Sequence, residues 1–234
     1  MPTALTVTLN AALDITYTVA GLTPGEPTRV ETVHTQAGGK GINVARILQC
    51  LRQPVFASGF AGGATGAQLL SDLERSGIPH HFVPIQEESR RTVTVLSSPS
   101  AAGPSRSPQL PGAAGQRPPQ SPEQQPALFC ELIEPGPQVS PVEWDGFVQE
   151  FEELLRRCDL VVLSGSLPPA IPTEAYAKLC AAGRRHGLPV IIDGSGPVLR
   201  QSLPAHPTIV KPNLQELAAT LGVNVSGTSV APTQ

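Results

Sequence analysis

The sequence predicts an α/β fold with a parallel sheet, and three observations support this prediction. Short apolar segments alternate along the chain with amphipathic segments of helical period, which is the pattern of a right-handed parallel α/β sheet. Glycine or polar clusters follow several of the apolar segments, as expected where strands end in loops. The chain has 234 residues, of which 40% are hydrophobic and 15% are charged, so it can bury one sizeable core.

The first part of the chain predicts two strands and a helix. Residues 4–9 and 28–35 alternate β-branched residues with others, so each is expected to form a strand, and the first is expected to lie in the core. Behind a cluster of glycines, apolar residues recur at helical spacing, at Ile42, Ala45, Leu48 and Leu51. This spacing predicts a helix with an apolar stripe.

The middle of the chain predicts more regular elements and then an insertion. Strands are expected over residues 55–60, 81–85 and 91–97, and a helix over 66–76. Residues 98–127 consist mainly of Pro, Ser, Gly, Gln and Ala. Such a segment buries too little apolar area to offset its ordering entropy, so we expect a disordered Pro-rich insertion, with a Pro-rich ligand for a partner domain as the alternative. A strand is expected to resume over 128–134.

A capping box opens the last part of the chain. Ser140-Pro141-Val142-Glu143 combines the box with a proline at the first helical position, and apolar residues follow at helical spacing, which predicts a core-facing helix. The elements expected after it are strands over 159–163, 189–192 and 208–210 and helices over 173–186 and 214–221.

Charge and cysteine usage exclude several classes of function. A net charge of −3 and a pI near 5.9 give no basic surface for nucleic acid or for an anionic membrane. The cysteines Cys50, Cys130, Cys158 and Cys180 are widely spaced and are expected to be reduced core residues. With no membrane-length apolar window and no secretory leader pattern, we expect a soluble cytoplasmic protein.

A glycine-lysine motif is the first candidate site. In Gly38-Gly39-Lys40-Gly41-Ile42-Asn43, glycine allows close backbone approach, the helix start offers free N–H groups and Lys40 adds a positive charge. The motif is not a Walker A loop, because Ile42 stands where that loop needs a hydroxyl. It predicts an anion site, although a glycine-rich turn with a solvated lysine is the alternative.

Polar clusters at the ends of predicted strands suggest the rest of the site. They are Asn10 and Asp14, Ser164-Gly165-Ser166, Asp193-Gly194-Ser195-Gly196 and Lys211-Pro212-Asn213. Each alone is explained by turn chemistry, but their carboxyl-end position in a parallel sheet is where ligands bind.

The chemistry of these side chains suits a phosphorylated sugar. Asp14 and Asn43 can bind hydroxyls, while Lys40 and either Arg90 or Arg91 can neutralise a phosphate. On the last predicted helix, Asn213 and Glu216 are spaced to hold a hydrated Mg²⁺, with an ordinary solvated first turn as the alternative.

Four motifs, in order, resemble the PfkB or ribokinase-like carbohydrate kinase family, and within it the kinases similar to 1-phosphofructokinase and tagatose-6-phosphate kinase. They are Thr8-Leu9-Asn10-Ala11-Ala12-Leu13-Asp14, the segment from Ala37 to Arg46, Ser164-Gly165-Ser166-Leu167-Pro168, and the segment from Lys211 to Leu217. The resemblance implies a ribokinase-like parallel-sheet sandwich with a small β lid, missing its C-terminal portion. Residues 1–234 would form one truncated domain, with the lid strands within about 15–36 and 81–134.

The resemblance also implies ligands and roles. ATP with Mg²⁺ would phosphorylate a sugar phosphate, most specifically fructose 1-phosphate to fructose 1,6-bisphosphate; tagatose 6-phosphate and fructose 6-phosphate are alternative substrates. The implied acceptor-sugar residues are Asp14, Gly39, Lys40, Asn43 and Arg91, with Arg90 as the alternative to the last. Those near the nucleotide phosphates are Lys211, Asn213 and Glu216, the latter two holding Mg²⁺ through water. A homodimer through the lid strands is a possible assembly.

One family motif is absent from these residues. The Gly-Ala-Gly-Asp segment, which in the family supplies the general base and an anion hole, does not occur in the 234 residues. Asp193 stands at the right edge of the sheet but matches a structural turn. Without base and anion hole we expect negligible phosphoryl transfer by this chain alone, so a non-catalytic sugar-phosphate-binding protein is the alternative function.

Overall fold

The computed structural model describes residues 1–23, 25–97 and 129–223. These residues divide into two compact units. The core unit comprises Met1–Asp14, Gln36–Arg91 and Glu134–Gln234, and the second unit comprises Ile15–Thr35 and Thr92–Ile133. The predicted insertion over 98–127 lies outside the described residues.

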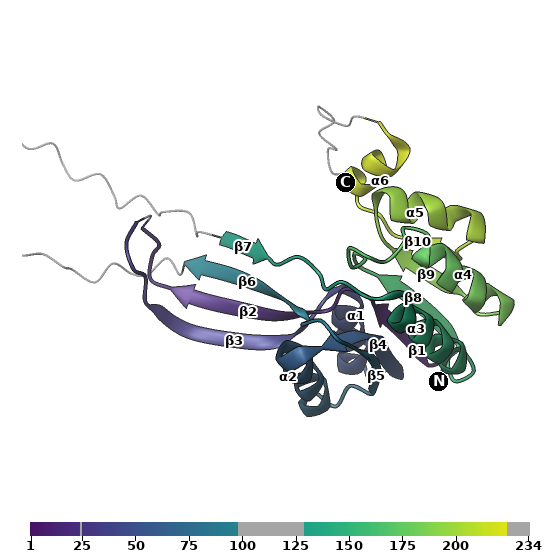
Figure 1. Ribbon diagram of the computed structural model, residues 1–234, viewed down its shortest axis with the longest axis horizontal. Helices are drawn as coiled ribbons and strands as arrows, with labels where there is room; N and C mark the ends of the chain where they lie inside the picture. Colours follow the sequence, from purple (N-terminus) through teal and green to yellow (C-terminus); the bar gives the residue numbers. More distant parts are fainter. Residues whose placement is uncertain (24, 98–128, 224–234) are drawn as a thin grey trace, which may run out of the picture. The chain divides into compact units, whose positions relative to one another are not determined.

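A parallel sheet forms the centre of the core unit. Among the described residues its strand order is β10-β9-β8-β1-β4-β5, and every pairing is parallel (Figure 1). The middle strand β1 pairs on both sides and is buried along its whole length. The strands are β1 (Ala4–Thr8), β4 (Val55–Gly62), β5 (His80–Ile85), β8 (Leu160–Ser164), β9 (Val190–Asp193) and β10 (Ile209–Val210).

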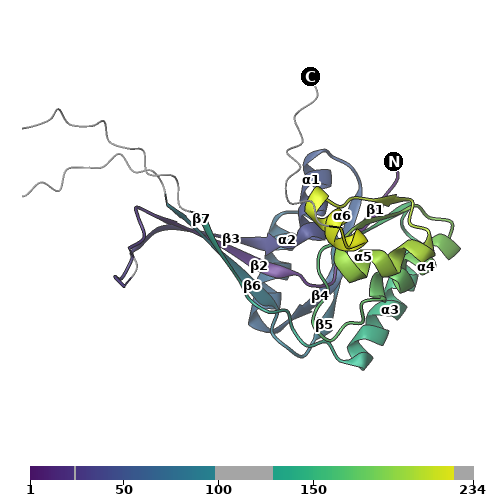
Figure 2. The ribbon, with the colours of Figure 1, turned by 90° about the horizontal axis from the view of Figure 1, so that it is seen from above.

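Helices cover both faces of this sheet and bury two apolar clusters. Phe60, Phe147, Phe151 and Tyr176 belong to the larger cluster, whereas Ile42, Leu69 and Leu73 belong to the smaller one, on α1 and α2. Figure 2 shows α3 and α4 together along one side of the core unit. The helices are α1 (Lys40–Cys50), α2 (Gly63–Arg75), α3 (Pro141–Leu155), α4 (Ala175–Arg185), α5 (Gly196–Ser202) and α6 (Leu214–Leu221), with a short 3₁₀ turn at Leu203–Ala205.

None of the helices in the described ranges is long and apolar enough to cross a membrane. The cysteines of those ranges are unpaired. Only Cys180 is fully buried, whereas Cys50 is exposed, so the prediction that all of them lie in the core is wrong. The reason is that Cys50 is the last residue of α1 and does not belong to the apolar stripe of this helix, so its side chain faces solvent.

The second unit is built on a separate sheet. Among the described strands its order is β3-β2-β6-β7, and β6 pairs with β7 in antiparallel fashion. These strands are β2 (Ala12–Val19), β3 (Val30–Gly38), β6 (Arg90–Ser97) and β7 (Phe129–Ile133). Large apolar side chains of this sheet are exposed, among them Val33, Phe129, Leu132 and Ile133.

The α/β prediction is confirmed, and three elements differ from the expectation. Strand β2 was not predicted from the local pattern, in which Asp14 suggested a loop after β1, although most of β2 lies within the lid range of 15–36 that the resemblance implied. Helix α5 was not predicted, because its Gly-Pro start was read as a turn. The expected lid range of 81–134 includes β5, which the structure places in the parallel sheet, because β5 pairs with β4 from Ala57–His80 to Gly62–Ile85.

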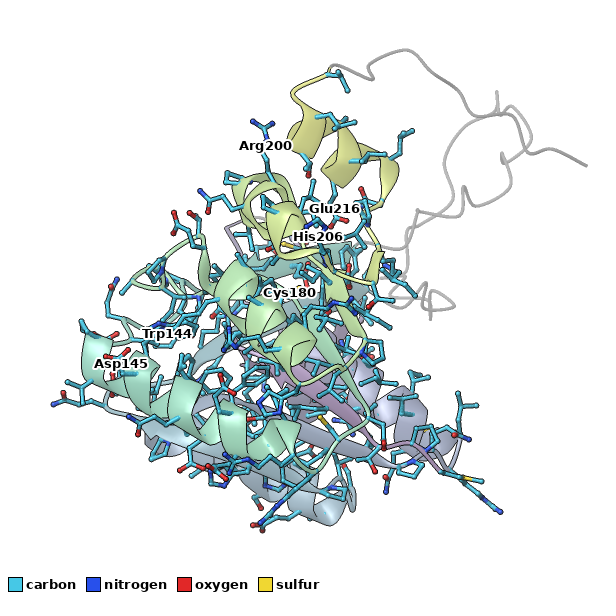
Figure 3. All side chains as sticks on the ribbon, turned by 90° about the vertical axis from the view of Figure 1, so that its right-hand side faces the viewer. Trp144, Asp145, Cys180, Arg200, His206 and Glu216 are labelled. Atoms are coloured by element: carbon cyan, nitrogen blue, oxygen red, sulfur yellow. The ribbon has the colours of Figure 1, made fainter. Side chains whose placement is uncertain are left out.

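The predicted capping box at the start of α3 is present. The Ser140 side chain accepts from the Glu143 N–H at 3.3 Å, and the Glu143 carboxylate accepts from the Ser140 N–H at 2.7 Å. Burial alone would raise the pKa of Glu143, but hydrogen bonds from Ser140 and from the Gln86 N–H outweigh it and lower the pKa. Behind the cap, Trp144 lies on the inner side of α3 and Asp145 on its outer side (Figure 3), as the apolar spacing requires.

Helix α1 packs so closely on β1 that its first turn has no room for a side chain at Gly41. A Cβ there would overlap the Thr8 hydroxyl and come within 2.7 Å of the Val7 carbonyl oxygen. Gly146, in α3, has open space around the same position.

We therefore expect opposite effects from one substitution at these two helical glycines. Gly41→Ala forces α1 away from β1 and should lower the free energy of unfolding by about 1–3 kcal/mol. Gly146→Ala should raise it by roughly 0.5–1 kcal/mol, because alanine has the higher helix propensity. Urea unfolding of both variants measures this, and equal effects at the two positions would contradict the close packing at Gly41.

Candidate active site at the carboxyl edge of the parallel sheet

Loops from separate parts of the chain meet at the carboxyl edge of the parallel sheet, as ligand sites of such sheets do. They line an open cavity of about 440 Å³. Its polar wall comes from α1, β9 and the start of α6, and its apolar wall from the outer side of α1. The lining residues are Lys40, Asn43, Val44, Ile47, Leu48, Asp193, Lys211, Asn213 and Glu216.

The glycine turn before α1 shapes one side of the site. Gly39 is the N-cap of α1 with φ of 112° and no side-chain cap, a conformation that strongly favours glycine. A Cβ at Gly38 would overlap the Asp14 carboxylate, so the missing side chain is what lets Asp14 lie against the turn. Asp14 thus lies against the turn that carries Gly39 and leads into Lys40, the first residue of α1, although neither Asp14 nor Gly39 lines the cavity.

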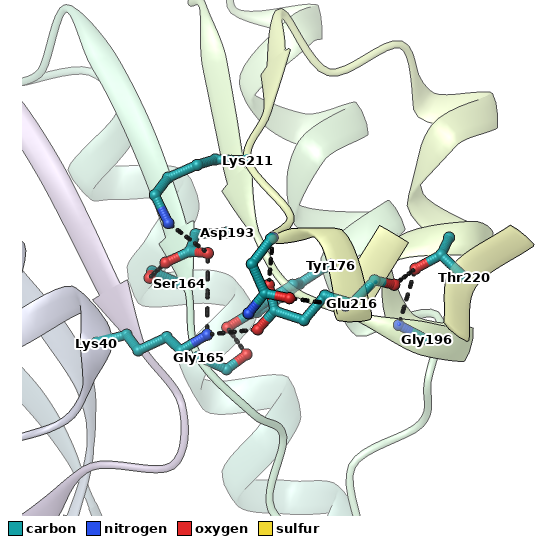
Figure 4. A network of polar contacts seen from close by, with 10 residues as sticks. Lys40, Ser164, Gly165, Tyr176, Asp193, Gly196, Lys211, Glu216 and Thr220 are labelled. Carbon is teal, nitrogen blue, oxygen red and sulfur yellow. Dashed lines mark hydrogen bonds and ion pairs between the residues drawn. The ribbon is translucent and has the colours of Figure 1, made fainter. Parts of the chain in front are cut away.

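Two lysines and two carboxylates form the polar wall of the cavity (Figure 4). The Lys40 Nζ lies 3.2 Å from Glu216 Oε1 and 3.9 Å from Asp193 Oδ1, and the Lys211 Nζ lies 3.6 Å from the same Asp193 oxygen. The lysine side chains are 49% and 73% exposed, whereas the carboxylate side chains are 15% and 20% exposed. The lysine side chains are therefore the more exposed groups of this wall, and the carboxylates lie deeper.

Neighbouring strands hold Asp193 in place. Its Oδ2 accepts from the Ser164 hydroxyl at 3.1 Å, and its carbonyl accepts from the Gly165 N–H at 3.0 Å. The buried Tyr176 hydroxyl donates to the Gly165 carbonyl at 3.2 Å. Burial, and then the charge of Asp193, raise the pKa of Tyr176 far above its ordinary value, so this phenol stays neutral and keeps the proton that it donates to Gly165.

Helix α6 begins with a second capping box, and one of its members also reaches Lys40. Asn213 Oδ1 accepts from the Glu216 N–H, and Glu216 Oε2 accepts from the Asn213 N–H, both at 2.8 Å. The Asn213 N–H and then Lys40 and Lys211 lower the pKa of Glu216. Its carboxylate is therefore charged at neutral pH, and its ion pair is lost only when the pH falls below that lowered pKa.

These contacts bear on the predicted Mg²⁺ ligands. Within the described ranges no three His, Cys, Asp or Glu side chains cluster to hold a metal ion directly. Asn213 and Glu216 use one oxygen each in the helix cap. However, Asp193 Oδ1 is buried without a hydrogen bond and faces the same Lys40 Nζ as Glu216 Oε1. This donor set fits a hydrated Mg²⁺ that takes its remaining ligands from water and substrate oxygens.

The two candidate arginines point to different places. The Arg91 guanidinium donates twice to the Thr65 hydroxyl at the start of α2, at 3.3 and 3.2 Å, and it does not line the cavity. The Arg90 Nε donates to the Asn10 carbonyl at 3.3 Å, just beyond β1. Both arginines therefore lie beyond carboxyl ends of strands of the parallel sheet, Arg90 beside the end of β1 and Arg91 beside the end of β4, and neither lines the cavity.

Sequence reasoning missed two features of the cavity. Asp193 was set aside as a structural turn, yet it is the carboxylate on which both lysines converge. The signal for it was its position directly after β9, at the edge where the other clusters lie. Of the apolar wall of Val44, Ile47 and Leu48, only Leu48 belongs to the predicted apolar stripe of α1; Val44 and Ile47 were not singled out, and Ile47 is 60% exposed.

Comparison with known proteins identifies the family to which this chain belongs. The family model described as pfkB family carbohydrate kinase matches residues 7–131 and 130–231. A possible 1-phosphofructokinase from Thermotoga maritima is 26% identical with a TM-score of 0.74, and the match covers 91% of this chain and 61% of that one. Phosphofructokinase-2 from Escherichia coli in complex with fructose-6-phosphate is 26% identical with a TM-score of 0.77, covering 97% and 66%. A putative phosphofructokinase from Staphylococcus aureus is 27% identical with a TM-score of 0.70, covering 95% and 63%.

Two further facts follow from these matches. Another structure of the E. coli protein is of a tetrameric inhibited form. This chain spans less than two thirds of the length of each of the three structures. Since the family model matches nearly all of it and the fold agrees, the chain belongs to the pfkB family of carbohydrate kinases.

Proposed function

We propose that this chain carries the substrate-binding face of an ATP-dependent sugar-phosphate kinase whose acceptor is fructose 1-phosphate and whose product is fructose 1,6-bisphosphate. The observation that carries the proposal is the position of Lys40. Its backbone belongs to the glycine turn that lies beside Asp14, while its Nζ meets Glu216 and Asp193 beside Lys211. Lys40 thus joins the acceptor-sugar residues to the residues proposed for the nucleotide phosphates.

On the acceptor side, Asp14 and Asn43 would bind sugar hydroxyls, because a carboxylate accepts and an amide both donates and accepts. Gly39 allows a close approach of the ligand to the turn. We assign the phosphate of the sugar to Arg91, with Arg90 as the alternative, because both lie beyond carboxyl ends of strands of the parallel sheet, at β4 and β1 respectively. Lys40 would add a second positive charge for this phosphate when its ammonium group turns away from Glu216.

The polar wall suggests how a nucleotide would be held. Lys40 and Lys211 balance Asp193 and Glu216, so a free anion competes with carboxylates already in place. When an anion binds together with Mg²⁺, each charged side chain can exchange its partner. The lysines then pair with the phosphate oxygens and the carboxylates with the hydrated cation. When bound, ATP with Mg²⁺ supplies the phosphoryl group and neutralises part of its charge.

We propose further that these 234 residues transfer phosphate negligibly by themselves, since they contain no Gly-Ala-Gly-Asp segment. No other aspartate of the cavity replaces that base within the described ranges, because Asp193 is held by Ser164 and paired with two lysines. A positioned base contributes about 10²- to 10⁴-fold, and the lost anion hole removes further stabilisation. We infer a cytoplasmic location from the unpaired cysteines.

The experiment that tests the function has two arms. The pure chain is titrated with fructose 1-phosphate, tagatose 6-phosphate and fructose 6-phosphate, and we expect fructose 1-phosphate to bind most tightly. A coupled assay with ATP and Mg²⁺ then measures transfer, and we expect none above background. Clear turnover would overturn the inactivity, and absence of binding by all of these ligands would overturn the sugar-phosphate site.

The exposed apolar side chains of the second sheet support a homodimer through these strands, since large exposed apolar patches mark interaction sites. We expect Val33→Glu, at a side chain that is 62% exposed, to weaken self-association about tenfold or more in analytical ultracentrifugation, because it places a charge in the interface. Val142→Glu is the matched control, because Val142 is 81% exposed on α3. A monomeric parent protein, or equal effects of both substitutions, would contradict this interface.

Lys40→Ala should weaken fructose 1-phosphate binding by about tenfold or more, because it removes the charge that joins the two halves of the site. Lys178→Ala is the control. The Lys178 Nζ lies 5.6 Å from the centre of the Trp144 ring on α3, so its loss changes a surface contact and should leave binding unaltered. Isothermal titration measures both, and equal losses would sink the assignment of Lys40.

Glu216→Gln should strengthen the binding of inorganic phosphate without metal and weaken the Mg²⁺-dependent binding of ADP. Without Mg²⁺ it frees Lys40 and should strengthen binding of inorganic phosphate by roughly two- to fivefold, the value of a partly exposed ion pair. It should also abolish most of the gain that Mg²⁺ gives the parent protein for ADP. Glu174→Gln, at an exposed position before α4, should do neither, and an unchanged Mg²⁺ response in Glu216→Gln would contradict the role of this carboxylate.

A further inference from the structure

The backbone of Ala37, directly before the glycine turn, is held on both sides by charged side chains. Its N–H donates to Asp72 Oδ2 at 2.8 Å, and its carbonyl accepts from Arg46 Nη2 at 3.0 Å. Arg46 lies on α1 and Asp72 on α2. The end of β3 is therefore tied to two helices at a single residue.

The two charged side chains also hold each other. Arg46 Nη2 lies 3.2 Å from Asp72 Oδ2, while Arg46 Nη1 donates to the Ser76 hydroxyl at 3.1 Å. The side chains are 27% and 13% exposed, so solvent screens this pair less than a surface pair. Burial alone would raise the pKa of Asp72, but hydrogen bonds from Ala37, Arg75 and Arg46 outweigh it and lower the pKa.

The residues that follow Ala37 have little conformational preference of their own. Gly38 and Gly39 can adopt many backbone angles, and Gly39 caps α1 without any side-chain hydrogen bond. A glycine turn that must present Lys40 in one position therefore needs to be fixed from outside. The contacts of Ala37 fix the residue directly before the turn. Because Arg46 belongs to α1, the same contacts also tie Ala37 to the helix that follows the turn.

We propose that Arg46 and Asp72 are positioning residues that clamp Ala37 and thereby hold the Gly38–Gly39 turn and Lys40 ready for the ligand. This inference rests on the proposed function for its ligand, though not for the clamp itself. Neither residue lines the cavity, so both act through the turn. A preformed turn raises affinity because the ordering cost is met before binding.

Hydrogen exchange tests the clamp without any ligand. In Arg46→Gln we expect the Ala37 amide to exchange about tenfold or more faster than in the parent protein, while amides of β8 keep their protection. Asp72→Asn keeps the shape but removes the charge that holds Arg46, and it provides the same test if Arg46→Gln does not fold. Arg75→Gln is the matched control, because Arg75 binds the other Asp72 oxygen at 3.2 Å and makes no contact with Ala37. Unchanged exchange of Ala37 in both clamp variants, or an equal rise in Arg75→Gln, would overturn the proposal.

A double-mutant cycle then separates positioning from a general structural role. In the parent background, Arg46→Gln should weaken binding of fructose 1-phosphate about tenfold. In a Lys40→Ala background it should weaken binding by less than about twofold, because the group that it positions is gone. Equal losses in both backgrounds would overturn the positioning role. Failure of the parent protein to bind would overturn the proposed function, while the exchange measurement would still decide whether the clamp exists.

Discussion

The parallel pairing of β1 with both β4 and β8 is the constraint on which the site depends. Because β1 pairs in parallel with both neighbours, β4 and β8 run in its direction and their carboxyl ends lie at the same edge of the sheet. Ser164 and Asp193 end β8 and β9, Lys211 directly follows β10, and Asp14 follows β1 in the chain. Residues far apart in the sequence therefore share one surface before any of them contacts another.

Electrostatics then determine what that surface can bind. The carboxylates of Asp193 and Glu216 lie deeper than the ammonium groups of Lys40 and Lys211, so each lysine can leave its partner for a ligand at little desolvation cost. A carboxylate left behind in a partly buried position is costly unless a cation replaces the lysine. Under the proposed function, the wall would therefore favour an anion that binds with a metal ion over a bare anion, which is a distinction of charge rather than of shape.

Interactions between near neighbours could be predicted from the sequence, and distant ones could not. The capping box of Ser140 and Glu143 was predicted because its members lie three residues apart. The same spacing at Asn213 and Glu216 led to a metal hypothesis, although both residues also form a helix cap. The ion pair between Lys40 and Glu216 joins residues 176 positions apart, and only the sheet order brings them together. For the same reason the range expected for the lid included β5, since the pairing of β5 with β4 cannot be recognised from the local sequence pattern.

The glycine turn shows why a recognisable motif did not by itself define the site. Its glycines provide room, for Asp14 at Gly38 and for β1 at Gly41, but room alone gives no preferred conformation. The preference comes from contacts of Ala37 with residues 9 and 35 positions away, on α1 and α2. Charged side chains on the two helices thus restrict a backbone that the glycines alone would leave free to adopt many conformations. The position of Lys40 is consequently a property of the folded core unit, and a peptide with the same motif would not be expected to hold its ammonium group in that place.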